Sequence, residues 1–268
     1  TTVCADTAVL NPFNNKVIRE AMNWAIDRNY VASEIYDGLA VPKISPISEA
    51  GADRARFAAE IRQLENQYAY NLEKANEVIT AEMEGMGAEL VDGKWSYNGA
   101  PVNLIFLIRT EDARLEIGNY VATQLESLGF TVERREGRSS ELSPLWVQSE
   151  PTECQWTVYT GAWSQTAIAR TDSDQFQFFY TPDAYPIPAF LAYTPDEDFR
   201  ALAQRLNDND FTTMEERAEL FREAFPLALQ ESNRVWVTSR TTLLPFSNDV
   251  SVTTDLAAGI SGAALWSK

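Results

Sequence analysis

A strand–helix–strand pattern in the middle of the chain constrains the fold more than any other feature. Residues 101–108 form an apolar run with no polar face, which is typical of a strand covered on both sides. Residues 110–128 follow with a helical period and end at Gly129, which suits a left-handed C-cap. The apolar face of this helix contains Ile117, Val121, Leu125 and Leu128. A second strand at residues 130–134 completes a unit that predicts a parallel strand pair with a right-handed crossover.

Helices and strands alternate irregularly along the rest of the chain. Apolar periodicity and capping residues predict helices at residues 16–26, 27–35, 52–65, 71–84, 195–207 and 212–230. Strands are expected at residues 89–91 and 94–97 around the turn Asp92-Gly93, and at 155–160, 235–239 and 242–246. Residues 40–47 and 176–193 are expected to be loop, the second with a short helix. The fold class is therefore α/β (α+β), with a mixed sheet flanked by helices.

The charged and reactive side chains exclude several classes of function. Asp and Glu number 39 against 22 Lys and Arg, and the resulting net charge of −17 argues against binding of nucleic acid. The chain has no histidine, which removes histidine-based nucleophile systems and histidine zinc sites. Two cysteines, Cys4 and Cys154, are too few for a four-cysteine zinc site, and the sequence leaves open whether they pair. We therefore expect no catalytic residue, no cofactor and no metal site.

Several short segments occur in an order that resembles one protein family. They are NPFNNKVIREA at residues 11–21 with AIDR at 25–28, GLAVP and SP between 38 and 46, YNLEKA at 70–75, the turns DG and NG before the apolar strand, LESLGFTV at 125–132 and TGAW at 160–163. No single segment is specific, but their order covers nearly the whole chain. In this order the chain is similar to the peptide/nickel family (family 5) of extracytoplasmic solute-binding proteins of ABC importers.

The resemblance implies one lobe of a two-lobed clamp of the type II periplasmic-binding-protein architecture. Residues 1–268 match the C-terminal lobe, so we expect a single ligand-binding lobe whose N-terminal lobe lies outside this sequence. The expected function is capture of an oligopeptide or oligosaccharide between the lobes and delivery to an ABC permease in the membrane. The resemblance also implies a monomer in the periplasm or another extracytoplasmic space, with any lipid anchor outside these residues.

Trp163 and Gln165 are the first candidates for ligand contact. Trp163 follows a strand and a glycine, where an aromatic ring can stack on a sugar or pack against a peptide side chain, although a tryptophan of the core is the alternative. Peptide-binding members of the family carry an aspartate two residues after the glycine–tryptophan pair, and this place falls on Gln165 or Ser164. Because neither residue is charged, the α-ammonium of a peptide would lack a counter-ion, which favours a neutral ligand. An oligopeptide stays an equal alternative.

Arg109 and Thr110 are further candidates because they follow the apolar strand at its carboxyl end, where open α/β sheets bind ligands. The alternatives are that Thr110 only caps the next helix and that Arg109 only pairs with Glu111 or Asp112. Tyr159, on the strand before Trp163, is a weaker candidate.

The alternative function is a carboxylate-dependent glycoside hydrolase domain. Such an enzyme needs two carboxyl groups about 5–10 Å apart, one of them kept protonated. The chain has 39 acidic residues but none in a catalytic motif, so we expect a binding protein rather than an enzyme.

Overall fold

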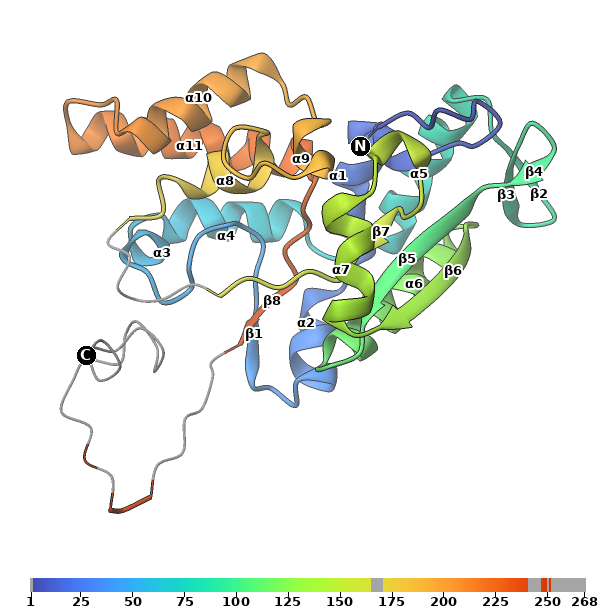
Figure 1. Ribbon diagram of the computed structural model, residues 1–268. Coiled ribbons are helices and arrows are strands. Elements are labelled where there is room, and N and C mark those ends of the chain that lie inside the picture. The colour runs from blue at the N-terminus through green and yellow to red at the C-terminus, as the bar shows by residue number, and fades with distance from the viewer. Residues whose placement is uncertain (1, 165–170, 241–246, 250, 252–268) are drawn as a thin grey trace.

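The computed structural model, which describes residues 2–164, 171–240, 247–249 and 251, contains a parallel sheet of three strands. The strand order is β6-β5-β7 (Figure 1). β5 (Asn103–Arg109) pairs in parallel with all of β6 (Thr131–Gly137) and with the short β7 (Val158–Tyr159). Helix α6 (Arg114–Ser127) connects β5 to β6, which confirms the predicted strand–helix–strand unit.

β7 is shorter than the strand predicted at residues 155–160 because side chains replace backbone acceptors at both its ends. The backbone N–H of Ile105 donates to the hydroxyl of Thr157 at 3.1 Å. At the other end, the backbone N–H of Arg109 donates to the hydroxyl of Thr160 at 2.8 Å. Regular pairing is therefore limited to the two residues between these threonines.

Helices cover both faces of the parallel sheet. α6 packs on β5 and β6 from one side, and α7 (Ser139–Gln148) packs on β5 from the other (Figure 1). Gly118 allows the close approach of α6, because a Cβ at this position would lie 2.6 Å from Cγ2 of Ile108. α7 corresponds to no predicted element, and it contains Pro144 in its interior, a residue that usually argues against a helix.

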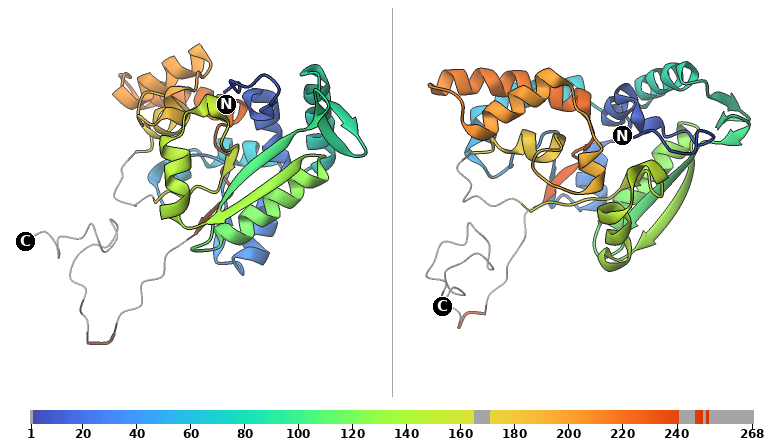
Figure 2. Two further views of the ribbon diagram at one scale, coloured as in Figure 1. Left: turned by 45° about the vertical axis from the view of Figure 1, so that its right-hand side comes forward. Right: turned by 45° about the horizontal axis from the view of Figure 1, so that its top comes forward.

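A group of helices packs beside the sheet (Figure 2). α1 (Lys16–Ala25) contacts α5 (Leu72–Gly85) and α11 (Met214–Glu231), and α10 (Glu197–Asp208) contacts α11 and α8 (Gln175–Tyr180). The remaining helices are η1 (Pro12–Asn14), α2 (Arg28–Tyr30), the π-helix η2 (Val31–Ile35), α3 (Ala52–Arg56), α4 (Ala58–Gln67), η3 (Pro151–Glu153) and α9 (Pro188–Leu191). Two predicted helices, at 27–35 and 52–65, are thus each divided into two shorter ones.

Antiparallel pairing occurs in two small sheets separate from the parallel one. β2 (Glu89–Val91), β3 (Lys94–Tyr97) and β4 (Ala100–Pro101) form the predicted hairpin and its extension. β1 (Ala40–Pro42) pairs with β8 (Thr238–Arg240), so part of the loop predicted at 40–47 is a strand. The strand expected at 242–246 lies outside the described residues. The α/β fold class, with sheets flanked by helices, is confirmed. Among the described residues, the parallel and antiparallel strand pairs lie in separate sheets and not in the one mixed sheet that was expected.

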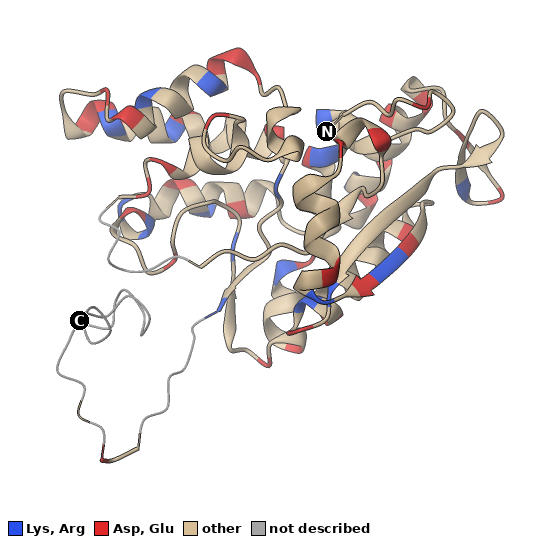
Figure 3. Ribbon diagram, viewed as in Figure 1, with Lys and Arg blue, Asp and Glu red and all other residues tan. Residues whose placement is uncertain are grey.

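β6 is an edge strand that carries charges of both signs. Glu133, Arg134, Arg135 and Glu136 are consecutive along it (Figure 3). Arg134 pairs with Glu126 of α6, and Arg135 pairs with Glu133.

Within the described residues, no helix has both the length and the apolar character needed to cross a lipid bilayer.

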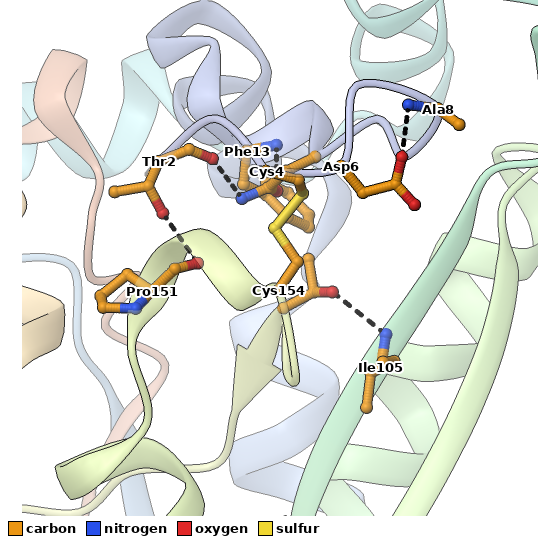
Figure 4. The surroundings of a disulfide bond; sticks show 10 residues. Thr2, Cys4, Asp6, Ala8, Phe13, Ile105, Pro151 and Cys154 are labelled. Atoms are coloured by element: carbon orange, nitrogen blue, oxygen red, sulfur yellow. Dashed lines mark hydrogen bonds between the residues drawn. A yellow bond between two sulfur atoms is a disulfide. The ribbon is translucent and has the colours of Figure 1, made fainter.

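Cys4 and Cys154 form a disulfide bond, which settles the question that the sequence left open (Figure 4). Their Cα atoms are 5.6 Å apart, although 150 residues separate them in the chain. The backbone N–H of Ala5 donates to the carbonyl of Thr152 at 2.7 Å, and the hydroxyl of Thr2 donates to the carbonyl of Pro151. The N-terminal segment is therefore fixed to the stretch that leads into β7.

Candidate functional site

Arg109 and Tyr159 meet at the carboxyl edge of the parallel sheet. Arg109 ends β5, and its Nη1 donates to the hydroxyl of Tyr159 at 3.0 Å. Its Nε and Nη2 donate to the two carboxylate oxygens of Glu111 at 2.6 and 3.0 Å. The predicted alternative that Arg109 pairs with Glu111 is thus confirmed. The structure also brings two of the candidate ligand residues into direct contact.

The N-terminal end of α7 completes this group. Oε1 of Glu111 accepts a hydrogen bond from the backbone N–H of Ser139 at 2.6 Å. The hydrogen bonds from Arg109 and from Ser139 lower the pKa of Glu111 to about 2. The hydrogen bond with Glu111 in turn raises the pKa of Arg109 above its ordinary value. The arginine and the glutamate are therefore both charged over the whole neutral range and compensate each other.

Tyr159 stacks on Trp146 of α7, with ring centres 5.1 Å apart and planes 19° apart. This stacking holds the tyrosine hydroxyl toward Arg109. Trp146 was missed by the sequence analysis because no element was predicted at residues 139–148.

Thr110 closes the ladder between β5 and β6 rather than capping a helix. Its backbone N–H donates to the carbonyl of Gly137 at 3.1 Å. The N-cap of α6 is Ala113, and the carboxylate of Asp112 accepts from the backbone N–H of Arg114 at 3.0 Å. The alternative that Thr110 serves as the helix cap is therefore wrong.

Trp163 lies on a platform of aromatic rings. Its ring centre is 4.7 Å from that of Phe178 and 5.4 Å from that of Phe179, both on α8. Trp163 is 51% exposed, which fits a ligand-facing ring and not the alternative of a core tryptophan. Phe179 below it is fully buried, so the platform is rigid. Gln165 lies outside the described residues.

Arg234 extends the aromatic platform and was not found from the sequence. Its guanidinium carbon lies 4.9 Å from the centre of the Phe179 ring and 4.8 Å from that of Phe190 on α9. α9 in turn contacts α7, which carries Trp146. The aromatic platform is thus linked through α9 and α7 to the group formed by Arg109, Glu111 and Tyr159 at the carboxyl edge of the sheet. No local motif marks Arg234, because the rings around it come from distant parts of the chain.

The neighbouring carboxyl groups of Asp172 and Asp53 do not form an accessible acid–base pair. Burial raises the pKa of Asp172 to about 6, although a hydrogen bond from the backbone of Ser48 opposes this. Its neighbour Asp53 is fully buried and is hydrogen-bonded by Arg217. A sugar ring cannot reach carboxylates enclosed in this way. Within the residues that the structure describes, no group of three or more acidic or cysteine residues could hold a metal ion.

A hollow of about 530 Å³ lies elsewhere, between the N-terminal segment and the residues after α9. Its buried charges are already partnered. Arg19 lies 3.5 Å from Glu231 and donates to the carbonyls of Phe13 and Asn14. Glu231 also accepts a hydrogen bond from the hydroxyl of Tyr193. We assign no ligand role to this hollow.

Comparison with known protein families gives one match over most of the chain. Residues 7–186 match the model of the bacterial extracellular solute-binding proteins, family 5 Middle. The chain belongs to this family. Proteins of the family are extracytoplasmic, bind small solutes such as peptides or sugars and work with ABC permeases. The resemblance seen in the sequence is therefore confirmed. A search of the curated proteins finds no match.

Solved structures of family 5 binding proteins share the fold. The oligopeptide-binding protein AppA from Bacillus subtilis, in complex with a nonapeptide, aligns with a TM-score of 0.63 and 16% identity. A mannohexaose-bound periplasmic oligopeptide-binding protein from Thermotoga maritima aligns with a TM-score of 0.64 and 16% identity. NikZ from Campylobacter jejuni, in complex with Ni(L-His), gives 0.62 and 13%. In each case the alignment covers 85% of this family 5 chain and 42% of the other, so the chain spans about two fifths of these relatives.

Proposed function

We propose that this family 5 chain is the C-terminal lobe of the substrate-binding component of an ABC importer. It captures an oligopeptide or an oligosaccharide in a cleft against its own N-terminal lobe and delivers it to the permease. The exposed ring of Trp163, supported by Phe178 and Phe179, is the observation that carries the proposal. An exposed tryptophan on a rigid base stacks on sugar faces and packs against peptide side chains. Its family supports an extracytoplasmic location, and we propose that the protein is a monomer.

Each candidate residue has a distinct role in this proposal. Trp163 supplies the stacking surface, and Gln165 offers an uncharged amide beside it. Arg109 is held by Glu111 and Tyr159, so the remaining N–H groups of its two terminal nitrogens and the hydroxyl of Tyr159 hydrogen-bond to the ligand. Thr110 offers its hydroxyl at the same edge of the sheet. The ligand then spans from the carboxyl edge to the aromatic platform.

Calorimetry tests the proposal with the full-length gene product that contains this chain. The two probe sets are cello-oligosaccharides and a mixture of di- to pentapeptides. We expect one set to bind with micromolar or tighter Kd, and Trp163→Ala to weaken that binding by roughly 5- to 30-fold, as expected for loss of a stacking contact of about 1–2 kcal/mol. Met214→Ala, which changes an exposed side chain at the start of α11, is the matched control and leaves Kd unchanged.

The same titrations separate this function from the hydrolase alternative. A binding protein returns the probe intact after prolonged incubation, and chromatography of the mixture measures this. The proposal is contradicted if neither probe set gives a binding signal, or if the cello-oligosaccharides are hydrolysed.

A further inference from the structure

Arg234 lies between two phenylalanine rings that belong to a series of four contacting aromatic rings. It lies between Phe179 and Phe190, at 4.9 and 4.8 Å from their ring centres. Phe178 and Tyr185 complete the circuit, with ring centres 5.0 Å from Phe179 to Phe178, 6.1 Å from Phe178 to Tyr185 and 5.8 Å from Tyr185 to Phe190. We call these five residues the Arg234 cage. Cation–π contacts with both phenylalanine rings fix the position of the guanidinium.

The cage leaves the hydrogen-bonding groups of Arg234 unused. Its Nε is buried and has no hydrogen-bond partner. Its two terminal nitrogens also make no hydrogen bond to any described residue. Unlike Nε, they are not fully buried and are therefore accessible to solvent. In the described part of the chain, no carboxylate oxygen lies within 4.0 Å of a guanidinium nitrogen of Arg234, the distance limit for an ion pair. By contrast, Arg109 and Arg217 each bind both oxygens of an acidic side chain.

Arg234 is nevertheless charged under ordinary conditions. Burial lowers the pKa of its guanidinium to about 10, and the nearby hydroxyl groups of Tyr180 and Tyr185 oppose this shift. A group with a pKa near 10 is protonated at pH 7. A partly desolvated cation without a counter-ion is unfavourable, and contacts with rings offset only part of this cost. In a chain with a net charge of −17, the lack of an acidic partner leaves a place for an external anion.

We propose that the Arg234 cage binds a carboxylate group of the transported solute, an inference that rests on the proposed function. The solvent-facing edge of a guanidinium matches the planar, two-oxygen geometry of a carboxylate. Trp163 contacts Phe178 and Phe179 of the cage and is half exposed, so the body of the ligand stacks on Trp163 while its carboxylate reaches Arg234. The carboxylate comes either from the C-terminus of a peptide or from a uronic acid of an oligosaccharide.

Two pairs of probes test the inference on the full-length gene product by calorimetry. The first pair is a pool of mixed pentapeptides with a free C-terminus and the same pool amidated at the C-terminus. The second pair is oligogalacturonate and its methyl ester. Within the pair that binds, we expect the carboxylate form to bind roughly 10- to 100-fold more tightly, as for a hydrogen-bonded charged pair. The pair that responds identifies the source of the carboxylate.

Variants of Arg234 show whether this preference comes from the cage. Arg234→Gln is expected to abolish the preference and to leave the Kd of the amidated or esterified probe within about twofold. Arg234→Lys keeps the charge but loses the two-nitrogen edge, so it retains part of the preference. Arg222→Gln is the matched control, because Arg222 is an exposed arginine that pairs with Glu60 and Glu215 on the protein surface. It leaves both affinities unchanged.

The outcomes separate this inference from the proposed function. If the unaltered protein binds the carboxylate form and the amidated or esterified form equally well, the inference is overturned and the proposed function stands. This outcome does not depend on whether the variants fold. A preference that survives in a folded Arg234→Gln protein also overturns it. No binding of any of the four probes or of the neutral sugars and peptides contradicts both proposals.

Discussion

Arg217 on α11 donates two hydrogen bonds to the carboxylate of Asp53 on α3, at 2.6 and 3.0 Å, across 164 residues of sequence. The two side chains are 4% and 0% exposed. The same pair holds the chain before α8, because Oδ2 of Asp53 accepts from the backbone N–H of Asp172 at 2.8 Å and Arg217 donates to the hydroxyl of Thr171 at 2.6 Å. α8 carries Phe178 and Phe179, so this ion pair positions the aromatic platform.

Replacing Arg217 should destabilise the protein strongly. Arg217→Met removes both hydrogen bonds of Arg217 from the buried carboxylate of Asp53, which keeps only the half-exposed Arg56 at 2.7 Å as a cationic partner among the described residues. We expect the free energy of unfolding to fall by about 3–5 kcal/mol. Urea denaturation followed by tryptophan fluorescence measures this. Arg222→Met, on the exposed side of the same helix, is the control and should cost less than about 1 kcal/mol. Equal losses in the two variants would count against the role of the pair.

The same ion pair should contribute to loss of stability in acid. Burial raises the pKa of Asp53, but hydrogen bonds from Arg217 and from the backbone of Asp172 outweigh this and lower it below its ordinary value of 3.8. A lowered pKa in the folded state stabilises the protein above pH 3.8, and this contribution is lost as the pH falls through the folded-state pKa. Asp53→Asn should therefore be less stable than the parent protein at pH 7, with a smaller difference at pH 2. Urea titrations at both pH values measure the difference.

Asp172 should show the opposite dependence on pH. Burial raises its pKa to about 6, so the folded state disfavours the charged form. The protonated form of Asp172 is favoured in the folded state, so its contribution to the free energy of unfolding is fully present below pH 3.8. This contribution decreases as the pH rises to about 6, by up to roughly 3 kcal/mol. Asp172→Asn should therefore raise the thermal midpoint at pH 7.5 but not at pH 3.5. Asp174→Asn, at the exposed position two residues on, is the control and should change neither value. A lower midpoint for Asp172→Asn at pH 7.5 would show that its charge is needed.

Gly118 should be intolerant of even a methyl group. Gly118→Ala places a Cβ 2.6 Å from Cγ2 and 2.9 Å from Cγ1 of Ile108, which is fully buried. We expect a loss of about 1–3 kcal/mol in the free energy of unfolding, because the helix must shift away from β5. Gly85→Ala is the matched control, since no atom lies within 4 Å of its Cβ, and it should be neutral or slightly stabilising. Denaturation curves of the two variants check the contrast.

The disulfide between Cys4 and Cys154 should contribute substantially to stability. Replacing both cysteines by serine is expected to lower the free energy of unfolding by about 2–5 kcal/mol, because the bond closes a loop with a sequence separation of 150 residues. Reductant should lower the thermal midpoint of the parent protein and leave that of the double variant unchanged. A parent protein that is insensitive to reductant would refute this.

The sequence predicted those parts of the fold that depend on local patterns. The strand–helix–strand unit at residues 101–134, the hairpin at Asp92-Gly93 and the long helices α5, α10 and α11 all agree with periodicity and turn residues. α7 was missed because Pro144 lies in its interior. The break of the helix predicted at 52–65 was also missed, because it occurs at Phe57, whose ring stacks on Phe221 of α11 at 4.5 Å. Tertiary packing, which a local pattern does not contain, decides such positions.

The candidate site was predictable to a similar extent. Arg109 and Thr110 follow from the rule that ligands bind at the carboxyl ends of parallel strands. Trp163 follows from its place just past a strand and a glycine, and Tyr159 from its place on that strand. The structure shows the contact between Arg109 and Tyr159 and the exposure of Trp163, whereas ligand binding by these residues stays a prediction. Arg234 could not be found, because the rings that enclose it lie some 40 to 60 positions earlier in the chain.

The charged edge strand β6 limits how two copies of this chain can associate. An edge strand exposes unpaired backbone groups, and a flat apolar edge would allow two copies to join their sheets. Glu133, Arg134, Arg135 and Glu136 place charge along this edge, and at the opposite edge β7 is only two residues long. Neither edge therefore offers a second molecule a long apolar strand to extend. The sheet that carries the candidate residues Arg109 and Tyr159 is in this way protected against growth into aggregates.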